Sequence, residues 1–315
     1  MGSRINIFFF TSRGHQTEDF RRIAARIGDL EPRIRAHAIP TSAQVSTVMS
    51  LPFRAIRPTV SIEMDARPAR LRLLRGKRLM QERLGGKIAQ YRRLEDAGLP
   101  VPRWVEITPG LSLSPEEWGP YVVEKPSRGS RGQGVRLRRT ARIAWKPPED
   151  FPDDHPVRRG PLIAQRYIHT GPRAEAYRVL TYFEEPILAM RYTEISDGPP
   201  REDLRVAGRS PGINIVAAAK GNRISTDVEE DVLALARQTH AAFPTIPSLG
   251  IDIMRDAADG SLWLAEINPS GNSWQFSLPS GQEIAETFGI DFYAQFGALD
   301  RIAERSIEIA RRYAL

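Results

Sequence analysis

The sequence predicts a mixed α/β (α+β) protein in which a small N-terminal α/β unit precedes a series of β-hairpins. Three observations support this class. Strand-like and helix-like patterns alternate over residues 1–78. Further on, residues 121–138 and 249–268 each have the pattern of two short strands joined by a turn. Apolar residues recur at helical spacing over residues 87–97 and 290–315. An alternating unit followed by hairpins and helices is typical of α/β and α+β proteins.

The N-terminal α/β unit is predicted to span residues 1–78. Thr17 or Asp19 can cap a helix that ends near Gly28. Ligands of such sheets bind beyond the carboxyl ends of the strands, so residues 12–15 either line a cleft or form an ordinary loop. The unit contains no G-x-G-x-x-G fingerprint of a dinucleotide-binding domain. Three strands are expected, at residues 4–10, 34–39 and 59–64.

Residues 79–315 follow the N-terminal unit. They open with a helical pattern that is interrupted at Gly85 and Gly86, so that Lys87 begins its amphipathic second half. A cation at a helix N-terminus opposes the helix dipole unless an anion binds there too, which points to phosphate contact. Further along the chain, we expect a hairpin at 174–193, a strand at 213–219 and a helix at 226–243.

Composition limits the class of protein. The chain has 315 residues, of which 41% are hydrophobic and 26% charged, as in ordinary soluble globular proteins of about two domains. No apolar run approaches the roughly 20 residues that a membrane span needs. The chain contains no Cys, which excludes disulfides and thiolate chemistry. We therefore expect a soluble cytoplasmic protein without a membrane partner.

The net charge is +7, but the basic residues are spread along the chain. Phosphate-backbone binders usually cluster their charge, so no nucleic-acid partner is expected, and a cleft for anionic small molecules fits equally well. The 45 basic residues include only five lysines. A lysine that persists in so Arg-rich a chain can be needed as a compact point charge, which singles out Lys87 and Lys125.

The stretch LGIDIMRDAADGSLWLAEINPSGNSW, residues 249–274, predicts a strand–turn–strand unit that carries two acids and an amide. Alternation along the second strand would place Leu264, Glu266 and Asn268 on one side, and Asp252 can join them from the partner strand. Two carboxylates and an amide without nearby His or Cys are ligands that suit Mg²⁺. The alternative is a solvated hairpin with ordinary surface acids.

The stretch YVVEKPSRGSRGQGVRLR, residues 121–138, predicts a second hairpin with a glycine-rich tip. Glycines let backbone N–H groups approach phosphate oxygens, and Lys125 would add a charge from the first strand. The pattern is neither a Walker loop nor a kinase glycine loop. Arg178 and Arg191 lie within apolar strand patterns, so each needs a partner acid or an anionic ligand.

The order of these elements resembles the ATP-grasp superfamily, and the chain is most similar to its glutamate-ligase and glutathione-synthetase-like branch. The motifs that carry the resemblance are GIDI with WLAEIN, then KIAQYRRLEDAGLPVP and VVEKPSRGSRGQGV. The resemblance covers about residues 79–274, and the preceding unit matches the pre-ATP-grasp domain of that superfamily. It implies an ATP-grasp fold with two subdomains, at 79–168 and 169–315.

The resemblance also implies roles for individual residues. Lys87 and Lys125 would contact the nucleotide phosphates, with Lys125 on the adenine side as well. Arg178 would stabilise the transferred phosphoryl group. Asp252, Glu266 and Asn268 would hold one or two Mg²⁺ ions, with Mn²⁺ as an alternative. Residues 127–134 would form a lid over the phosphates, with contacts from Ser127, Ser130 and Gly132. The hinge that binds adenine would consist of Gln165, Arg166, Tyr167 and Ile168.

The chain departs from the pattern of the superfamily at three places. Gln165 stands where many members have an acid. Ala176 stands where members often have an acid two residues before the arginine, and Glu175, one position off, would be the ribose contact. The sequence NPSGNSW replaces the usual N-x-x-P-G after the metal-binding Asn, so the identity of the substrate does not carry over.

The resemblance implies an ATP-dependent carboxylate–amine ligase that works through an acyl phosphate and releases ADP and phosphate. Its substrates would be a small-molecule or peptide carboxylate and an amine, gripped by Arg191, Arg205 and Arg209. A small-molecule kinase on the same fold and a non-catalytic ATP-binding module are the alternatives. The sequence leaves open whether the chain forms a homodimer.

Overall fold

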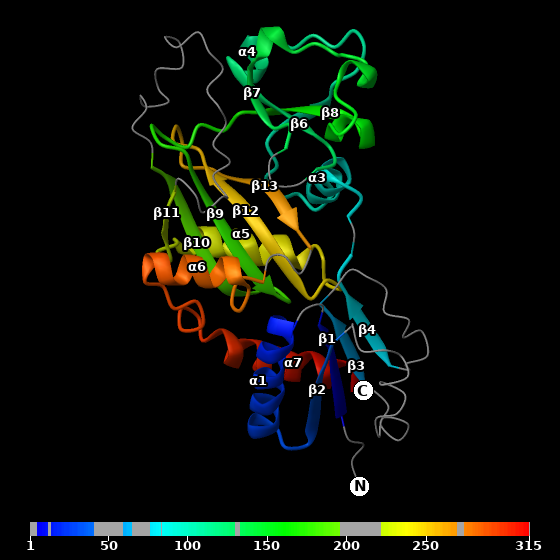
Figure 1. Ribbon diagram of the computed structural model, residues 1–315, viewed down its shortest axis with the longest axis vertical. Coiled ribbons are helices and arrows are strands. Elements are labelled where there is room, and N and C mark those ends of the chain that lie inside the picture. The colour runs from blue at the N-terminus through cyan, green and yellow to red at the C-terminus, as the bar shows by residue number, and fades with distance from the viewer. Residues whose placement is uncertain are drawn as a thin grey trace.

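The computed structural model describes residues 5–11, 14–40, 59–64, 76–82, 84–129, 133–195, 222–269 and 274–314. These residues form three β-sheets with helices packed against them, which confirms the predicted α/β class. Figure 1 shows the sheets arranged along the long axis of the molecule, with the five-stranded sheet between the two four-stranded ones.

The first sheet is parallel and has the order β2-β1-β3-β4. Ile7 and Phe9 on β1 alternate towards a hydrophobic core that they share with Phe20 and Ile23. The strands are β1 (Ile5–Thr11), β2 (Ile34–Pro40), β3 (Val60–Glu63) and β4 (Lys77–Met80), and the helices on this core are α1 (Gly14–Leu30) and α7 (Ala298–Ala314).

Two expectations for this region are wrong. The helical pattern expected from residue 79 does not form there, because Lys77–Met80 pairs with β3 as the edge strand β4. Four residues are too few for periodicity to distinguish a strand from a helix. Helix α1 begins at Gly14, so Thr17 and Asp19 lie inside it and do not cap it.

The second sheet is antiparallel and has the order β5-β8-β6-β7. A small core that includes Trp118, Val122 and Ala164 holds it together. The helix α4 (Pro115–Trp118) is capped by the side chain of Ser114. The strands are β5 (Trp104–Glu106), β6 (Tyr121–Pro126), β7 (Arg136–Arg139) and β8 (Leu162–Arg166), and the 3₁₀ turns are η2 (Thr140–Arg142), η3 (Pro148–Asp150) and η4 (Pro156–Arg159).

The third sheet is antiparallel, with the order β11-β10-β9-β12-β13. Tyr177 and Val179 share a core with the helix α5, whereas Leu180 and Tyr182 belong to the core shared with α7 on the opposite face. The strands are β9 (Glu175–Tyr182), β10 (Glu185–Glu194), β11 (Asn222–Ser225), β12 (Ser248–Arg255) and β13 (Leu262–Asn268), and the remaining helices are α3 (Lys87–Asp96), α5 (Glu230–Ala241) and α6 (Pro279–Phe288).

Most predicted elements of the C-terminal half form, with shifted boundaries. The hairpins at 174–193 and 249–268 correspond to β9–β10 and β12–β13. Helix α5 begins four residues later than expected, and α7 begins at Ala298 instead of residue 290. The short strand β11 was not expected. The strand predicted at 213–219 lies outside the described residues.

A buried carboxylate on α1 ties the segment after β13 to the N-terminal sheet. Asp19 accepts hydrogen bonds from Trp274 Nε1 at 2.8 Å, Ser277 Oγ at 2.5 Å and Tyr293 Oη at 2.7 Å. Trp274 also packs against Phe20 of α1, with ring centroids 5.1 Å apart. Three charge-assisted hydrogen bonds therefore fix the position of the chain from Trp274 onwards against the N-terminal sheet.

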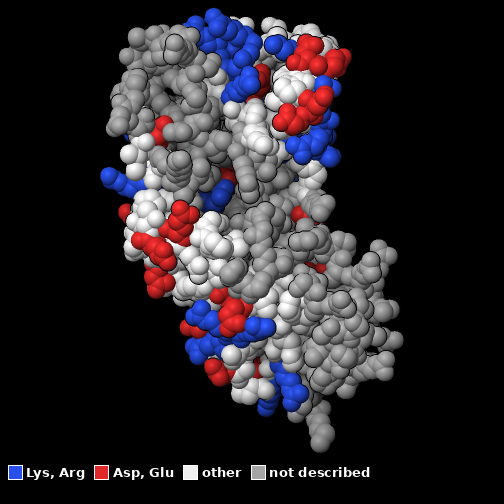
Figure 2. Space-filling model, in the orientation of Figure 1, with Lys and Arg blue, Asp and Glu red and all other residues white. Residues whose placement is uncertain are grey.

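None of the helices in the described residues is long and apolar enough to cross a membrane. On the face shown in Figure 2, basic and acidic side chains lie in separate small groups, and one basic group lies at the end that carries the second sheet.

Two glycine positions give a matched test of packing. A Cβ at Gly281 on α6 would lie 1.7 Å from the carbonyl oxygen of Gln275, whereas at Gly28, exposed on α1, nothing lies within 4 Å. Gly281→Ala should therefore lower the free energy of unfolding by about 3 kcal/mol. Gly28→Ala should raise it by about 0.5–1 kcal/mol, because alanine is the better helix former. Urea denaturation measures both; effects of the same sign would contradict this packing.

Candidate active site

A β-bulge brings the two acids of the β12–β13 hairpin together. Asp252 pairs with Glu266, but Ile253 pairs with Leu264, so Ala265 is an extra residue on β13. In an unbroken ladder, Glu266 would share a face with Leu264, which lies in the core beneath α5. The bulge changes this alternation. The expectation that Leu264 lies beside Glu266 is therefore wrong, whereas Glu266 and Asp252 do face the same side.

Arg178 on the neighbouring strand β9 faces Asp252 and binds it with both arms of the guanidinium. The Nε–Oδ1 distance is 2.7 Å, and the second nitrogen donates to Oδ2 at 2.8 Å. The carboxylate of Asp252 raises the pKa of Arg178 above its ordinary value, so the guanidinium stays charged. Asn268 completes the group by donating from Nδ2 to Asp252 Oδ2 at 3.3 Å.

Lys87, the first residue of α3, provides the cation for the other acid. Its Nζ lies 3.0 Å from Glu266 Oε1 and 3.5 Å from the carbonyl oxygen of Gly129 in the glycine-rich hairpin. Its backbone N–H donates to Ser127 O at 2.8 Å. Gly86 permits this approach, since it has a φ of 103° and a Cβ there would lie 2.8 Å from Ser127 O. The helix N-terminus, the hairpin and β13 therefore meet at Lys87.

Lys125, on β6, is buried beside α3. Its Nζ donates to Tyr91 Oη at 2.6 Å, and the Tyr91 hydroxyl donates to the carbonyl oxygen of Ala265 at 2.7 Å. Burial lowers the pKa of Lys125 to about 7; the nearby Lys87 adds to this shift, and Glu266 and Asp252 oppose it. The sequence pattern does not single out Tyr91, because its helical spacing with Ile88 and Leu94 indicates only a core position.

The arrangement fits a divalent cation bound together with an anion. Three oxygen-bearing side chains, from Asp252, Glu266 and Asn268, lie on one face of the sheet. No group of three or more His, Cys, Asp or Glu side chains in the described residues could hold a metal ion, so other oxygens must complete a coordination shell. Mg²⁺ usually completes its shell with water and phosphate oxygens. Lys87 and Arg178 place positive charge beside the acids, and Lys125 adds to it when it is protonated, as phosphate binding requires.

The predicted hinge residues lie where the second sheet leads into the third. Gln165, on β8, is buried and donates to the carbonyl oxygen of Pro102 at 3.5 Å. Arg166 is exposed, with its guanidinium 5.9 Å from the centre of the Trp263 ring. Tyr167 is partly buried and Ile168 is buried. The segment therefore lies between the two sheets whose residues form the site.

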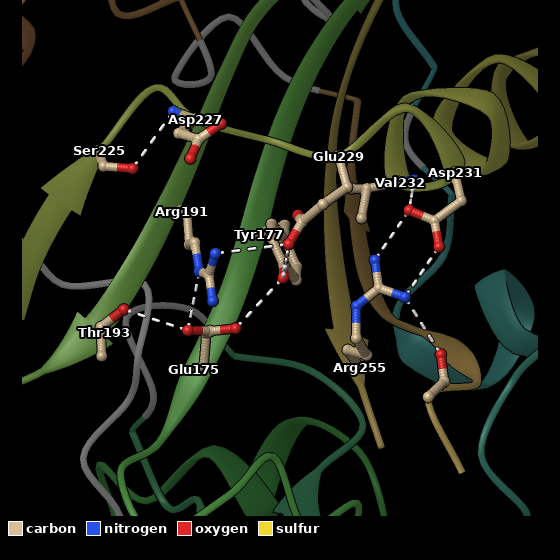
Figure 3. Close-up of polar contacts among 11 residues, drawn as sticks. Glu175, Tyr177, Arg191, Thr193, Ser225, Asp227, Glu229, Asp231, Val232 and Arg255 are labelled. Carbon is tan, nitrogen blue, oxygen red and sulfur yellow. Dashed lines mark hydrogen bonds and ion pairs between the residues drawn. The ribbon is translucent and has the colours of Figure 1, made fainter. Parts of the chain in front are cut away.

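Two predicted residues lie on the opposite face of the third sheet. Arg191 pairs with Tyr177 across the ladder, so it points away from Arg178. Its Nε lies 2.8 Å from Glu175 Oε2, and Glu229 and Tyr177 extend this network (Figure 3). The structure therefore does not bring Arg191 or Glu175 to the acids at Asp252 and Glu266. Of the two partners that the apolar strand pattern predicted for Arg191, an acid or an anionic ligand, the structure has the acid, Glu175.

The remaining predicted contacts divide between described and undescribed residues. Ser127 is buried at the base of the glycine-rich hairpin, where its N–H donates to Pro161 O at 2.8 Å. Ser130, Gly132, Arg205 and Arg209 lie outside the described residues.

Burial of Lys125 predicts a pH-dependent stability. The folded side chain loses its proton near pH 7, whereas the unfolded one holds it up to its ordinary pKa of 10.5. At any pH between these two pKa values, unfolding therefore takes up a proton. The free energy of unfolding then rises with pH by up to about 1.4 kcal/mol per pH unit. Lys125→Met removes this contribution. In urea denaturation from pH 7 to about 10, the free energy of unfolding of the wild type should rise relative to that of the variant. A difference between the two that does not change with pH would exclude this burial of Lys125.

Comparison with known proteins places this geometry in a known fold. No protein-family model and no curated protein matches the sequence. Among solved structures, the D-cycloserine synthetase DcsG superposes with a TM-score of 0.52 at 15% identity, over 98% of this chain and 99% of that chain. The ATP-grasp ligase PsnB, complexed with precursor peptide PsnA2 and AMPPNP, superposes with a TM-score of 0.51 at 17% identity. The match covers 97% of this chain and 98% of the PsnB chain. A second PsnB complex, with a phosphomimetic variant of the minimal precursor, Mg and ADP, has a TM-score of 0.51 at 14% identity. This match covers 98% of this chain and 99% of the PsnB chain. The chain has the ATP-grasp fold.

Proposed function

We propose that this protein is an ATP-dependent carboxylate–amine ligase that forms an acyl phosphate and releases ADP and phosphate. The observation that carries the proposal is the opposed pair Asp252 and Glu266, each bound to a cation of the chain, next to the buried Lys125. On an ATP-grasp fold, such a group of charges suits a nucleotide triphosphate and its metal ion. PsnB, which has this fold, binds Mg and ADP in one of its complexes.

In the proposed reaction, a substrate carboxylate oxygen attacks the γ-phosphorus, and the bond to the β-phosphate oxygen breaks to release ADP. An amine then attacks the acyl carbon, phosphate leaves, and the amine loses a proton to give the amide. Asp252, Glu266 and Asn268 would hold Mg²⁺, which would offset the charge on the transferred phosphoryl group. Lys87, Lys125 and Arg178 would position the phosphates. No protein nucleophile takes part.

The remaining contacts follow from the resemblance and from the chemistry of the residues. The segment of Gln165, Arg166, Tyr167 and Ile168 would bind the adenine base, since it joins the two sheets that flank the site. The glycine-rich hairpin would cover the phosphates, with Ser130 and Gly132 as further contacts. Arg205 and Arg209 would grip the acceptor carboxylate, because arginine matches a carboxylate with two parallel hydrogen bonds. We leave Arg191 and Glu175 out of the site, because they form an ion pair on the far face.

The substrates would be a carboxylate and an amine, as free small molecules or within a peptide. PsnB has been seen with a precursor peptide, and DcsG is named a D-cycloserine synthetase, so this fold serves both sizes of substrate. Product analysis tests the reaction type. Purified protein is incubated with Mg-ATP and pooled carboxylates and amines, and ADP, AMP and phosphate are quantified together. Equal ADP and phosphate that require both an acid and an amine would support the ligase. ADP without free phosphate would indicate a kinase, and AMP would exclude the mechanism.

Two arginine-bound aspartates provide a matched pair of variants. Asp252 binds Arg178 at 2.7 and 2.8 Å in the site, and Asp231 binds Arg255 at 2.8 and 2.8 Å near the start of α5 (Figure 3). Asp252→Asn should lower ATP turnover by at least about 100-fold, since it removes a charged metal ligand, whereas Asp231→Asn should stay within about twofold of the wild type. Coupled measurement of ADP release gives both rates. Equal losses would mean that the ion pairs serve stability alone.

A further inference from the structure

The hydroxyl group of Tyr91 joins three parts of the candidate site. Tyr91 lies on α3, and its side chain is fully buried. Its oxygen is 2.6 Å from Lys125 Nζ on β6 and 2.7 Å from the carbonyl oxygen of Ala265 on β13. One atom therefore connects the helix that begins at Lys87, the strand that carries Lys125, and the strand that carries Glu266.

The chemistry of the two partners fixes the direction of both hydrogen bonds. The carbonyl oxygen of Ala265 can only accept, so the Tyr91 O–H must point towards it. The lone pairs of the phenol then face Lys125, which donates one N–H to them. Burial raises the pKa of Tyr91, which keeps the phenol protonated and preserves this direction. Lys125 is thereby held in one orientation, with its other hydrogens available for a ligand.

The contact with Ala265 stabilises the bulge. Ala265 is the residue of β13 that has no partner in the ladder with β12. A bulge leaves such a residue outside the regular pairing, and a carbonyl that is partly shielded from water loses stability without a donor. Tyr91 supplies that donor. Since the bulge turns Glu266 towards Asp252, the hydroxyl supports the opposed arrangement of the two acids.

We propose that Tyr91 is a positioning residue, which orients Lys125 towards the nucleotide and supports the bulge that sets Glu266 opposite Asp252. The assignment rests on the proposed Mg-nucleotide site. Its effect would be exerted through two other residues: removing the hydroxyl should weaken nucleotide binding through Lys125 and metal binding through Glu266, without removing any group that contacts either ligand.

The test compares Tyr91→Phe with Tyr182→Phe. Tyr182 is an equally buried tyrosine in the third sheet, and its hydroxyl lies 2.9 Å from Ser306 Oγ, away from the acids. Binding of ADP alone is measured by calorimetry, and binding of Mn²⁺ to the ADP complex by electron paramagnetic resonance, with circular dichroism to confirm folding. Tyr91→Phe should lose about tenfold in each affinity, whereas Tyr182→Phe should stay within about twofold. Equal affinities in the two variants overturn the assignment.

A double-mutant cycle separates positioning from general loss of stability. If Tyr91 acts on the nucleotide through Lys125, the effect of Tyr91→Phe on ADP affinity should disappear in a Lys125→Met background, whereas its effect on Mn²⁺ affinity should persist. Additive losses in ADP affinity overturn this route. If Tyr91→Phe does not fold, Tyr91→Met, which fills the space without an O–H or N–H donor, takes its place. It should bind Mn²⁺ less tightly than the wild type, and wild-type affinity would overturn the assignment.

The failure of the assignment is distinguishable from that of the proposed function. If the wild-type protein does not bind Mn²⁺ with ADP, or if Asp252→Asn and Glu266→Gln bind it unchanged, the proposed site is wrong and the role of Tyr91 falls with it. If those two variants lose Mn²⁺ but Tyr91→Phe does not, only the role of Tyr91 is overturned.

Discussion

The candidate site depends on holding two carboxylates opposite each other at the same place on neighbouring strands. Asp252 and Glu266 would repel each other without nearby positive charge, and the chain supplies a separate cation to each. Arg178 comes from the adjacent strand, so its position is fixed by the ladder itself. Lys87 comes from the start of a helix that lies outside the sheet. The central sheet therefore fixes the positions of the two acids. The packing of α3 against β13 determines whether Lys87 reaches Glu266, so that each acid has a cation beside it.

The same packing connects the two sheets that a nucleotide would lie between. Helix α3 contacts the glycine-rich hairpin through the backbone of Lys87, β6 through the contact of Tyr91 with Lys125, and β13 through Ala265. These contacts are short and mostly buried, where hydrogen bonds and charges are screened less than in water. A change in the position of α3 would therefore alter the positions of the two lysines and of the two acids together. The cations now paired with the acids are also those best placed to meet phosphate groups.

Much of the fold could be predicted from local patterns, and the part that could not depends on long-range contacts. Alternation identified the hairpin that carries Asp252 and Glu266, and the glycines identified the hairpin after Lys125. The bulge at Ala265 was not predictable, because LWLAEIN contains no glycine or other local signal for an extra residue. The role of Tyr91 was hidden for a similar reason, since its partners lie 34 and 174 positions away. Arg191 and Arg178 look alike in sequence, and only the register of β9 and β10 separates them.

The central claim is that Lys87, Lys125 and Arg178 bind nucleotide phosphates while Asp252 and Glu266 bind the metal ion. A crystal structure of the protein with Mg²⁺ and a non-hydrolysable ATP analogue tests it most directly. The account predicts Mg²⁺ at about 2.1 Å from oxygens of both acids, with the three cations on the phosphates. Mg²⁺ and phosphates bound elsewhere, or acids still paired with Lys87 and Arg178 beside a bound nucleotide, would contradict it.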